Sequence, residues 1–287
     1  MRSRIRLIIP LLFPLFALTV LAAPSPGAVT VAATHPWIAL LAGFIGGKNV
    51  TVLPLLSWNS EGAVVQSDRG RALKSLTKDA MVLALDAGDA RNAGLDNSVY
   101  PNLRCLYTAF PIRGSSVDAM LSDPSVLPFV AQRVLTALSH WDPSGYPYYQ
   151  RRLAEFQARL FGAVLSGQQV LRGVTVYNLS GASGALLRAS GCKVMDPAPD
   201  QLAEWGKGRY SGLKEIIASN WEHGVATVTD GLTPRPLLKF LSGRPGTFLF
   251  GRPAADQDYT AFLHDQYIAL WQMVSARQKA LNDNAKK

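Results

Sequence analysis

The sequence predicts an α/β protein of two lobes, each a mainly parallel sheet flanked by helices, joined by one long linker helix. Short β-branched segments alternate with helical segments in both halves of the 287-residue chain, an order typical of parallel sheets covered by helices. One unbroken helical stripe separates the two halves. The length suits one large or two modest domains, which agrees with a two-lobe arrangement.

The first 28 residues have a different character from the rest of the chain. Three arginines lie within residues 1–6, an apolar stretch runs from Leu7 to Leu21, and small residues follow up to Ala28. This order is typical of a secretory signal peptide. The apolar stretch has about 15 residues, fewer than the roughly 20 of a membrane span. We therefore expect export to the periplasm and removal of residues 1–28, with a retained membrane anchor as the alternative.

The charge of the remaining chain is mildly basic and diffuse. The formal net charge is +9, and loss of the three signal arginines reduces it to about +6. Like charges never run longer than a pair, such as Arg151-Arg152. Nucleic-acid binding favours a basic stripe with interleaved aromatic residues, so we expect no nucleic-acid partner.

The chain holds two cysteines, Cys105 and Cys192. They fall in different predicted lobes. An oxidising compartment would allow them to pair, and such a disulfide would restrain movement between the lobes. The alternative, which we favour, is two buried thiols.

The N-terminal lobe is predicted to comprise residues 29–141. Asp123 suits the N-cap of its last helix, and Pro124 suits the first helical position. The predicted strands are 29–34, 50–56, 81–85 and 103–110, the predicted helices are 37–45, 69–77 and 123–140, and the predicted loops are 57–62 and 86–100.

The linker is predicted within residues 142–169, with its helix from Tyr148 to Gln169. Its apolar residues recur three or four positions apart, which is one face of a helix, whereas arginines and a glutamate occupy the other face. A helix of about 20 residues is roughly 30 Å long. The apolar stripe consists of Tyr149, Leu153, Phe156, Leu160 and Val164.

The C-terminal lobe is predicted to comprise residues 170–287 and to repeat the plan of the first. Its final helix, from Tyr259, carries an aromatic stripe that we assign to the core. The predicted strands are 174–177, 192–195, 225–229 and 247–250, and the other predicted helices are 182–190, 213–220 and 234–241.

The order of these parts resembles the periplasmic solute-binding proteins of zinc and manganese ABC importers. The likeness is spread thinly over nearly the whole mature chain. It rests on Val31-Ala-Ala-Thr-His-Pro-Trp, on Asp118-Ala-Met-Leu-Ser-Asp-Pro, on the entry to the linker helix at 138–160, and on Gly224-Val-Ala-Thr-Val-Thr-Asp. The resemblance implies a monomer that binds a divalent metal ion, zinc or manganese, between its lobes and delivers it to an ABC permease without performing chemistry.

The resemblance also implies a ligand set, and here the chain departs from the family. Members usually bind the ion with three histidines and one carboxylate, a donor set that suits zinc. The matching positions in this chain hold Ser60 or Glu61, Asp118, residues near Asn178 to Ser180, and Asp230. An oxygen-rich site of Glu61, Asp118, Asn178 and Asp230 would suit a harder ion such as manganese. Each acid alone has the alternative of a solvated loop carboxylate.

Several other residues are expected at the edge of the cleft. His35 ends the first strand, and its alternative role is helix entry before Pro36. Trp58, Ser60 and Ser180 fall in the loops after predicted strands. Ser180 opens a Gly- and Ser-rich turn whose free N–H groups resemble an anion cradle, although the lysine of a P-loop is absent.

Two other functions stay open. The same bilobed fold could have lost metal binding and could bind an organic ligand or a partner protein, with Trp37, Trp58 and Tyr177 lining a pocket. A periplasmic enzyme on an unrelated α/β fold is the third alternative. The sequence contains no Gly-x-Ser-x-Gly elbow and no His-Glu-x-x-His, so we expect no catalytic activity.

Overall fold

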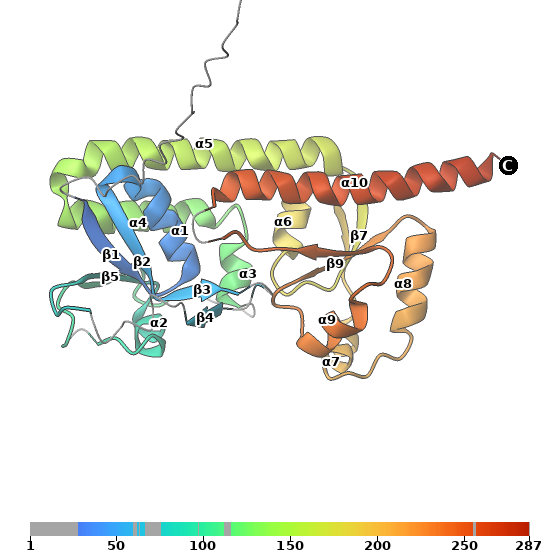
Figure 1. Ribbon diagram of the computed structural model, residues 1–287, viewed down its shortest axis with the longest axis horizontal. Helices are drawn as coiled ribbons and strands as arrows, with labels where there is room; N and C mark the ends of the chain where they lie inside the picture. Colours follow the sequence, from blue (N-terminus) through green and yellow to red (C-terminus); the bar gives the residue numbers. More distant parts are fainter. Residues whose placement is uncertain are drawn as a thin grey trace, which may run out of the picture.

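The protein has two lobes that lie side by side beneath two long helices (Figure 1). The computed structural model describes residues 28–59, 62, 64–66, 76–96, 98–111, 116–254 and 257–286. The predicted signal peptide therefore lies outside the described residues, apart from Ala28. The α/β class and the two-lobe arrangement predicted from the sequence are confirmed.

The N-terminal lobe is built on a four-stranded sheet in the order β2-β1-β5-β6. All its strand pairs are parallel, and the order places the first strand at the centre. A separate antiparallel hairpin, β3 with β4, follows β2. The strands are β1 (Val29–Ala33), β2 (Val50–Pro54), β3 (Leu56–Trp58), β4 (Val64–Gln66), β5 (Met81–Ala84) and β6 (Leu103–Cys105).

The C-terminal lobe repeats this plan with the order β10-β9-β7-β8, again all parallel. When the four strands of each sheet are numbered in chain order, both sheets have the strand order 2-1-3-4. The shared topology confirms that the two halves have one plan. The strands are β7 (Thr175–Asn178), β8 (Lys193–Met195), β9 (Ala226–Asp230) and β10 (Thr247–Phe250).

Helices cover both faces of each sheet, as parallel sheets require. The shorter helices of the N-terminal lobe are α1 (Pro36–Gly46), α2 (Ala87–Asn92), α3 (Val117–Leu121) and α4 (Leu127–Trp141). Those of the C-terminal lobe are α6 (Gly184–Ala189), α7 (Pro199–Gly206), α8 (Leu213–Glu222) and α9 (Arg235–Leu241).

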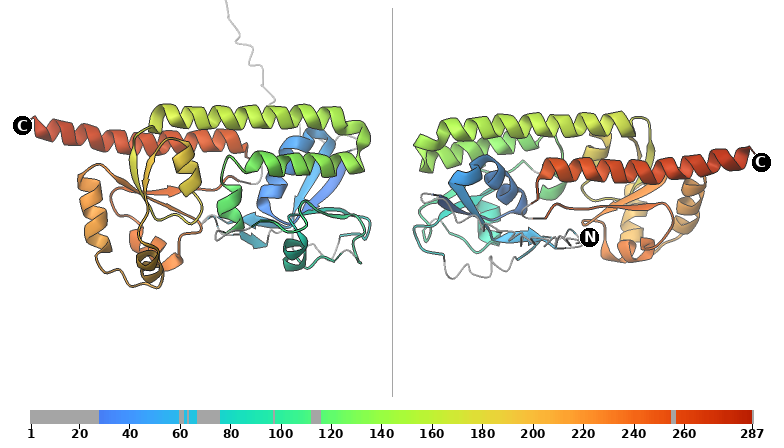
Figure 2. Two further views of the ribbon diagram at one scale, coloured as in Figure 1. Left: turned by 180° about the vertical axis from the view of Figure 1, so that it is seen from behind. Right: turned by 45° about the horizontal axis from the view of Figure 1, so that its top comes forward.

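Two long helices tie the lobes together. The linker helix α5 (Tyr146–Leu171) spans both lobes, and α10 (Tyr259–Ala285) begins between them and lies along α5, as both views in Figure 2 show. The helices approach closely at Gly167, where an added Cβ would lie 2.7 Å from the Tyr267 ring. The predicted stripe of α5 is buried from Tyr149 to Leu160.

The largest hydrophobic core crosses the boundary between the lobes. It contains Ile38 and Leu83 from the N-terminal lobe, Phe156 from α5, and Val176 and Tyr267 from the C-terminal side. Two smaller cores lie under the other face of each sheet, one around Val82 and one around Trp205. Because the main core is continuous, the lobes are packed on a common base.

Several boundaries differ from those predicted. The second predicted strand divides at Leu55 into β2 and β3, so Ser57 and Trp58 lie in a strand and not in a polar loop. Helix α4 begins at Leu127, because residues 124–126 form a turn after Asp123. Helices α2, α3 and α7 were not predicted. Most of the predicted helix 69–77 lies outside the described residues.

The two cysteines are both free thiols. Cys192 is buried as expected, but Cys105 is exposed at the end of the edge strand β6, so the expectation of two buried thiols is wrong for Cys105. Among the described residues, no helix is both long and apolar enough to cross a membrane.

Candidate functional site

A cluster of aromatic and charged side chains lies on the N-terminal lobe at the ends of β1 and β3. Asp118, buried in the first turn of α3, accepts hydrogen bonds from two tryptophans of this cluster. One carboxylate oxygen, Oδ1, accepts the indole N–H of Trp37 at 3.0 Å and that of Trp58 at 3.3 Å. The two indole rings meet edge to face with centroids 5.2 Å apart. One oxygen of Asp118, a predicted metal ligand, therefore already accepts hydrogen bonds from two neutral donors.

His35 lies beside this cluster and performs a local structural task. It is the N-cap of α1, and its Nδ1 accepts the backbone N–H of Trp37 at 3.3 Å. Burial lowers the pKa of His35 below its ordinary value. The negative charges of Asp118 and Asp89 raise this pKa by less than burial lowers it, and the positive charge of Arg252 lowers it further. The imidazole is therefore neutral near pH 7 and adds no positive charge to the cluster.

Arg252 reaches this cluster from the other lobe. It follows β10, and its Nη1 donates to the Ser122 hydroxyl of the N-terminal lobe at 2.8 Å. Its Cζ lies 5.8 Å from the ring centroids of both Trp37 and Trp58. The Nε and Nη2 atoms of Arg252 are buried and have no hydrogen-bond partner among the described residues. A half-buried cation with two buried, unpaired donor atoms thus spans the junction of the lobes.

Asp230, at the end of β9, is the corresponding carboxylate of the C-terminal lobe. It is completely buried, and its oxygens accept hydrogen bonds at 2.7–3.1 Å from five backbone N–H groups and from the Ser183 hydroxyl. The five N–H groups belong to Gly181, Ala182, Ser183, Leu232 and Thr233. The sequence motif that resembles an anion cradle therefore holds the chain's own carboxylate.

Asn178 and Ser180 belong to the same turn before α6. The Asn178 amide donates to Asp196 at 2.7 Å, and its oxygen accepts the backbone N–H and the hydroxyl of Ser180. The Ser180 hydroxyl in turn accepts the N–H of Ser183 at 3.2 Å. These side chains organise the entry to α6 together with Asp230.

The predicted site residues therefore form two groups, one on each lobe. His35, Trp58 and Asp118 come together on the N-terminal lobe, and Asn178, Ser180 and Asp230 come together on the C-terminal lobe. The two lobes come into contact where Gly62 approaches Gly231. A Cβ added to Gly62 would lie 3.0 Å from the Gly231 Cα. Ser60 and Glu61 lie outside the described residues.

The described residues do not fit a divalent metal ion. They contain no group of three or more His, Cys, Asp or Glu side chains placed to hold one. The Asp230 oxygens and the Asn178 oxygen already accept several hydrogen bonds each, and the Arg252 guanidinium lies near the two indole rings that donate to Asp118. His140, His223 and His264 lie in α4, at the end of α8 and in α10, as expected from the sequence.

Sequence reasoning did not identify Arg252 as a site residue. Gly251 and Arg252 directly follow β10, an edge strand of the sheet. The carboxyl ends of parallel strands gather at one edge, where ligands bind in open α/β sheets. An arginine at this position, in Gly251-Arg-Pro, was the available signal.

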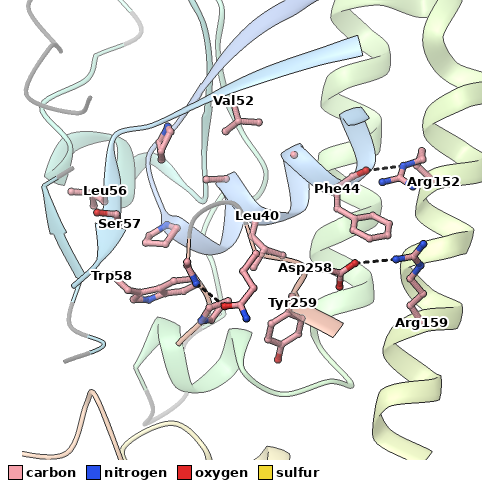
Figure 3. Close-up of a pocket in the computed structure, with 17 residues that line it drawn as sticks. Leu40, Phe44, Val52, Leu56, Ser57, Trp58, Arg152, Arg159, Asp258 and Tyr259 are labelled. Atoms are coloured by element: carbon pink, nitrogen blue, oxygen red, sulfur yellow. Dashed lines mark hydrogen bonds and ion pairs between the residues drawn. The ribbon is translucent and has the colours of Figure 1, made fainter. Parts of the chain in front are cut away.

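A cavity of about 760 Å³ is lined in part by Trp58, which also belongs to this cluster. Figure 3 shows Leu40, Val52, Trp58 and Tyr259 on its apolar wall, with the Arg159–Asp258 ion pair at the linker-helix side. Pro253, which follows Arg252, also lines it. Its size lies within the range of small-molecule pockets, so the cross-lobe cluster adjoins space that a ligand could fill.

Comparison with known proteins finds similarity at the level of structure. No protein-family model matches the chain, and no curated protein matches its sequence. A deletion mutant of ZnuA with zinc bound matches with a TM-score of 0.59 and 15% identity, covering 87% of this chain and 98% of that chain.

Two further solved structures match over nearly their whole length. The laminin-binding protein Lmb of Streptococcus agalactiae, a bifunctional protein with adhesin and metal transporting activity, has a TM-score of 0.59 at 16% identity, covering 86% of this chain and 100% of that chain. The solute-binding protein FpvC of Pseudomonas aeruginosa in complex with Mn²⁺ has a TM-score of 0.56 at 15% identity, with coverages of 88% and 99%. The chain therefore has the fold of the bilobed solute-binding proteins of zinc and manganese ABC importers.

Proposed function

We propose that the chain is the exported solute-binding component of an ABC importer of the zinc and manganese structural type. It would collect a solute between its lobes in the periplasm, act as a monomer without a membrane anchor after signal removal, and present both lobes to a permease. It would perform no chemistry. The division into lobes 29–141 and 170–287 around the linker 142–169 belongs to this proposal.

One observation carries the proposal. Residues of two lobes, Arg252 directly after β10 in one lobe and Trp58 of β3 with Asp118 of α3 in the other, meet in one partly buried cluster beneath a common helical base. Polar groups that converge from two lobes at the carboxyl edges of their sheets are typical of ligand sites in α/β proteins.

A transport assay tests the proposed function. The mature chain, without residues 1–28, is added to nanodiscs that contain an ABC permease and ATPase of the zinc and manganese type from the same organism. We expect the chain to raise the rate of ATP hydrolysis in a saturable way, because solute-binding components act by docking on the permease. Absence of any stimulation, together with recovery of the chain from the cytoplasmic fraction, would refute the proposal.

Metal binding by this chain stays a separate prediction with its own measurement. A ligand that binds only the folded state raises the melting temperature. Because the described residues do not fit a divalent ion, we expect excess zinc or manganese to leave the melting temperature of chelator-treated protein unchanged. A saturable rise that Asp118→Ala abolishes, while Asp200→Ala retains it, would instead establish a metal site that includes Asp118.

A further inference from the structure

We propose that the cleft of this chain binds a small carboxylate through Arg252, whose guanidinium contributes the positive charge that a metal ion contributes in other proteins of this fold. The inference rests on the proposed function and names its solute class. Three observations carry it: two unpaired donors on one edge of Arg252, the charge of the surrounding cluster, and the position of that cluster between the lobes.

The unpaired donors have a geometry that selects the ligand. In a guanidinium, Nη1 lies on the side of Cδ, so Nε–H and one N–H of Nη2 point in the same direction from the opposite edge. Nη1 is the atom that donates to Ser122, and Nε and Nη2 are the buried atoms without a partner among the described residues. This edge matches the two oxygens of a carboxylate in a bidentate pair.

Leaving these donors unpaired is costly. A buried donor without an acceptor destabilises a protein, and more so when it is charged. The two indole rings near Arg252 lie 5.8 Å from its Cζ, close to the outer limit of about 6 Å for cation–π attraction. They offset only part of the desolvation. A planar anion with two acceptor atoms would satisfy both donors at once.

The charges of the cluster favour a ligand with one negative charge. Arg252 is the cation, Asp118 is an anion that already faces the two indoles, and His35 is held neutral by burial. A second negative charge on the ligand would face Asp118 without another cation among the described cluster residues. The site is therefore suited to a monocarboxylate or to the zwitterion of an amino acid, and not to a phosphate dianion.

Arg252 is also placed where closure of the lobes would act on a ligand. Its backbone follows β10 in the C-terminal lobe, whereas Ser122, Trp37 and Trp58 belong to the N-terminal lobe. The unpaired edge is buried in this arrangement, so a ligand reaches it when the lobes separate and is enclosed when they close. Trp58 and Pro253, the residue after Arg252, line the 760 Å³ cavity, which offers space for an apolar part of the solute.

The test is a ligand panel on the mature chain. Thermal melting and calorimetry are run with each of the protein amino acids, with lactate, with succinate and with inorganic phosphate. We expect at least one amino acid or monocarboxylate to raise the melting temperature saturably and phosphate to have no effect. Failure of every amino acid and monocarboxylate, or binding of phosphate in preference to them, would overturn the inference.

Variants of Arg252 locate the binding. Arg252→Lys keeps the charge and loses the planar fork, so we expect at least a tenfold loss of affinity for the panel member that binds. Arg244→Lys, a partly buried arginine of the same lobe that donates to the Phe240 carbonyl oxygen, is the matched control and should bind like the original chain. Equal affinity of Arg252→Lys and the original chain would overturn the assignment.

Two further measurements keep the result unambiguous. If Arg252→Lys does not fold, Ser122→Ala removes the partner of Nη1 and the local hydrogen bond from the Ser122 hydroxyl to the Asp118 carbonyl oxygen, and keeps the guanidinium. It should weaken binding less than tenfold but measurably; unchanged affinity would count against the site. Stimulation of the permease ATPase without carboxylate binding would refute the solute class alone. Carboxylate binding without stimulation would refute the importer function alone.

Discussion

Replacing Asp230 with alanine is expected to lower the melting temperature by roughly 6–20 °C, one of the two largest effects expected for a single change in this protein. The substitution leaves five buried backbone N–H groups and the Ser183 hydroxyl without their acceptor. Loss of one partner in such a buried network costs about 3–5 kcal/mol. One kcal/mol corresponds to about 2–4 °C in a protein of this size.

Two companion variants separate this effect from a general loss of charge. Asp230→Asn retains one acceptor oxygen, so its melting temperature should lie between those of the original chain and Asp230→Ala. Asp200→Ala removes an exposed carboxylate in the first turn of α7 and should cost less than about 1 kcal/mol. A drop for Asp200→Ala as large as that for Asp230→Ala would contradict the structural role given to Asp230.

The second large effect is expected at Tyr267, which joins α10 to α5. Its ring is completely buried, meets the backbone of α5 at Gly167, and lies edge to face with Phe250 at 6.3 Å. Truncation of a buried aromatic residue to alanine costs about 3–5 kcal/mol. We therefore expect Tyr267→Ala to lower the free energy of unfolding, measured by urea denaturation, by that amount.

The conservative variant of the same residue should behave differently. The Tyr267 hydroxyl is buried without a hydrogen-bond partner in the part of the chain that is described, and burial raises its pKa. Because Tyr267→Phe removes this unpaired group and keeps the ring, we expect stability equal to or greater than that of the original chain. A loss as large as that of Tyr267→Ala would show that the hydroxyl has a stabilising partner.

The sequence was most informative where apolar residues recur at a regular spacing along one helix or strand. The stripe from Tyr149 to Leu160 predicted α5 to within two residues at each end, since one face of a long helix must be apolar to pack on a core. The β-branched runs predicted the strand cores for a similar reason. Short helices such as α3, with five residues, contain too few turns to show a period.

The candidate site was only partly predictable, and the reason is physical. The family resemblance identified Asp118 and Asp230 as candidate ligands. It did not reveal which of their oxygens already accept hydrogen bonds, because the partners of Asp230 are backbone N–H groups, which every residue type except proline carries. The role of Arg252 depends on contacts with Ser122, 130 positions away, which no local pattern encodes.

The continuous core under α5 and α10 has a consequence for every measurement described above. Residues of both lobes share one set of buried contacts, so neither lobe has a separate set of contacts large enough to melt independently of its neighbour. Heat should therefore unfold the whole described chain in a single cooperative step. A solute held by either lobe alone would stabilise both, and one calorimetric peak would report it.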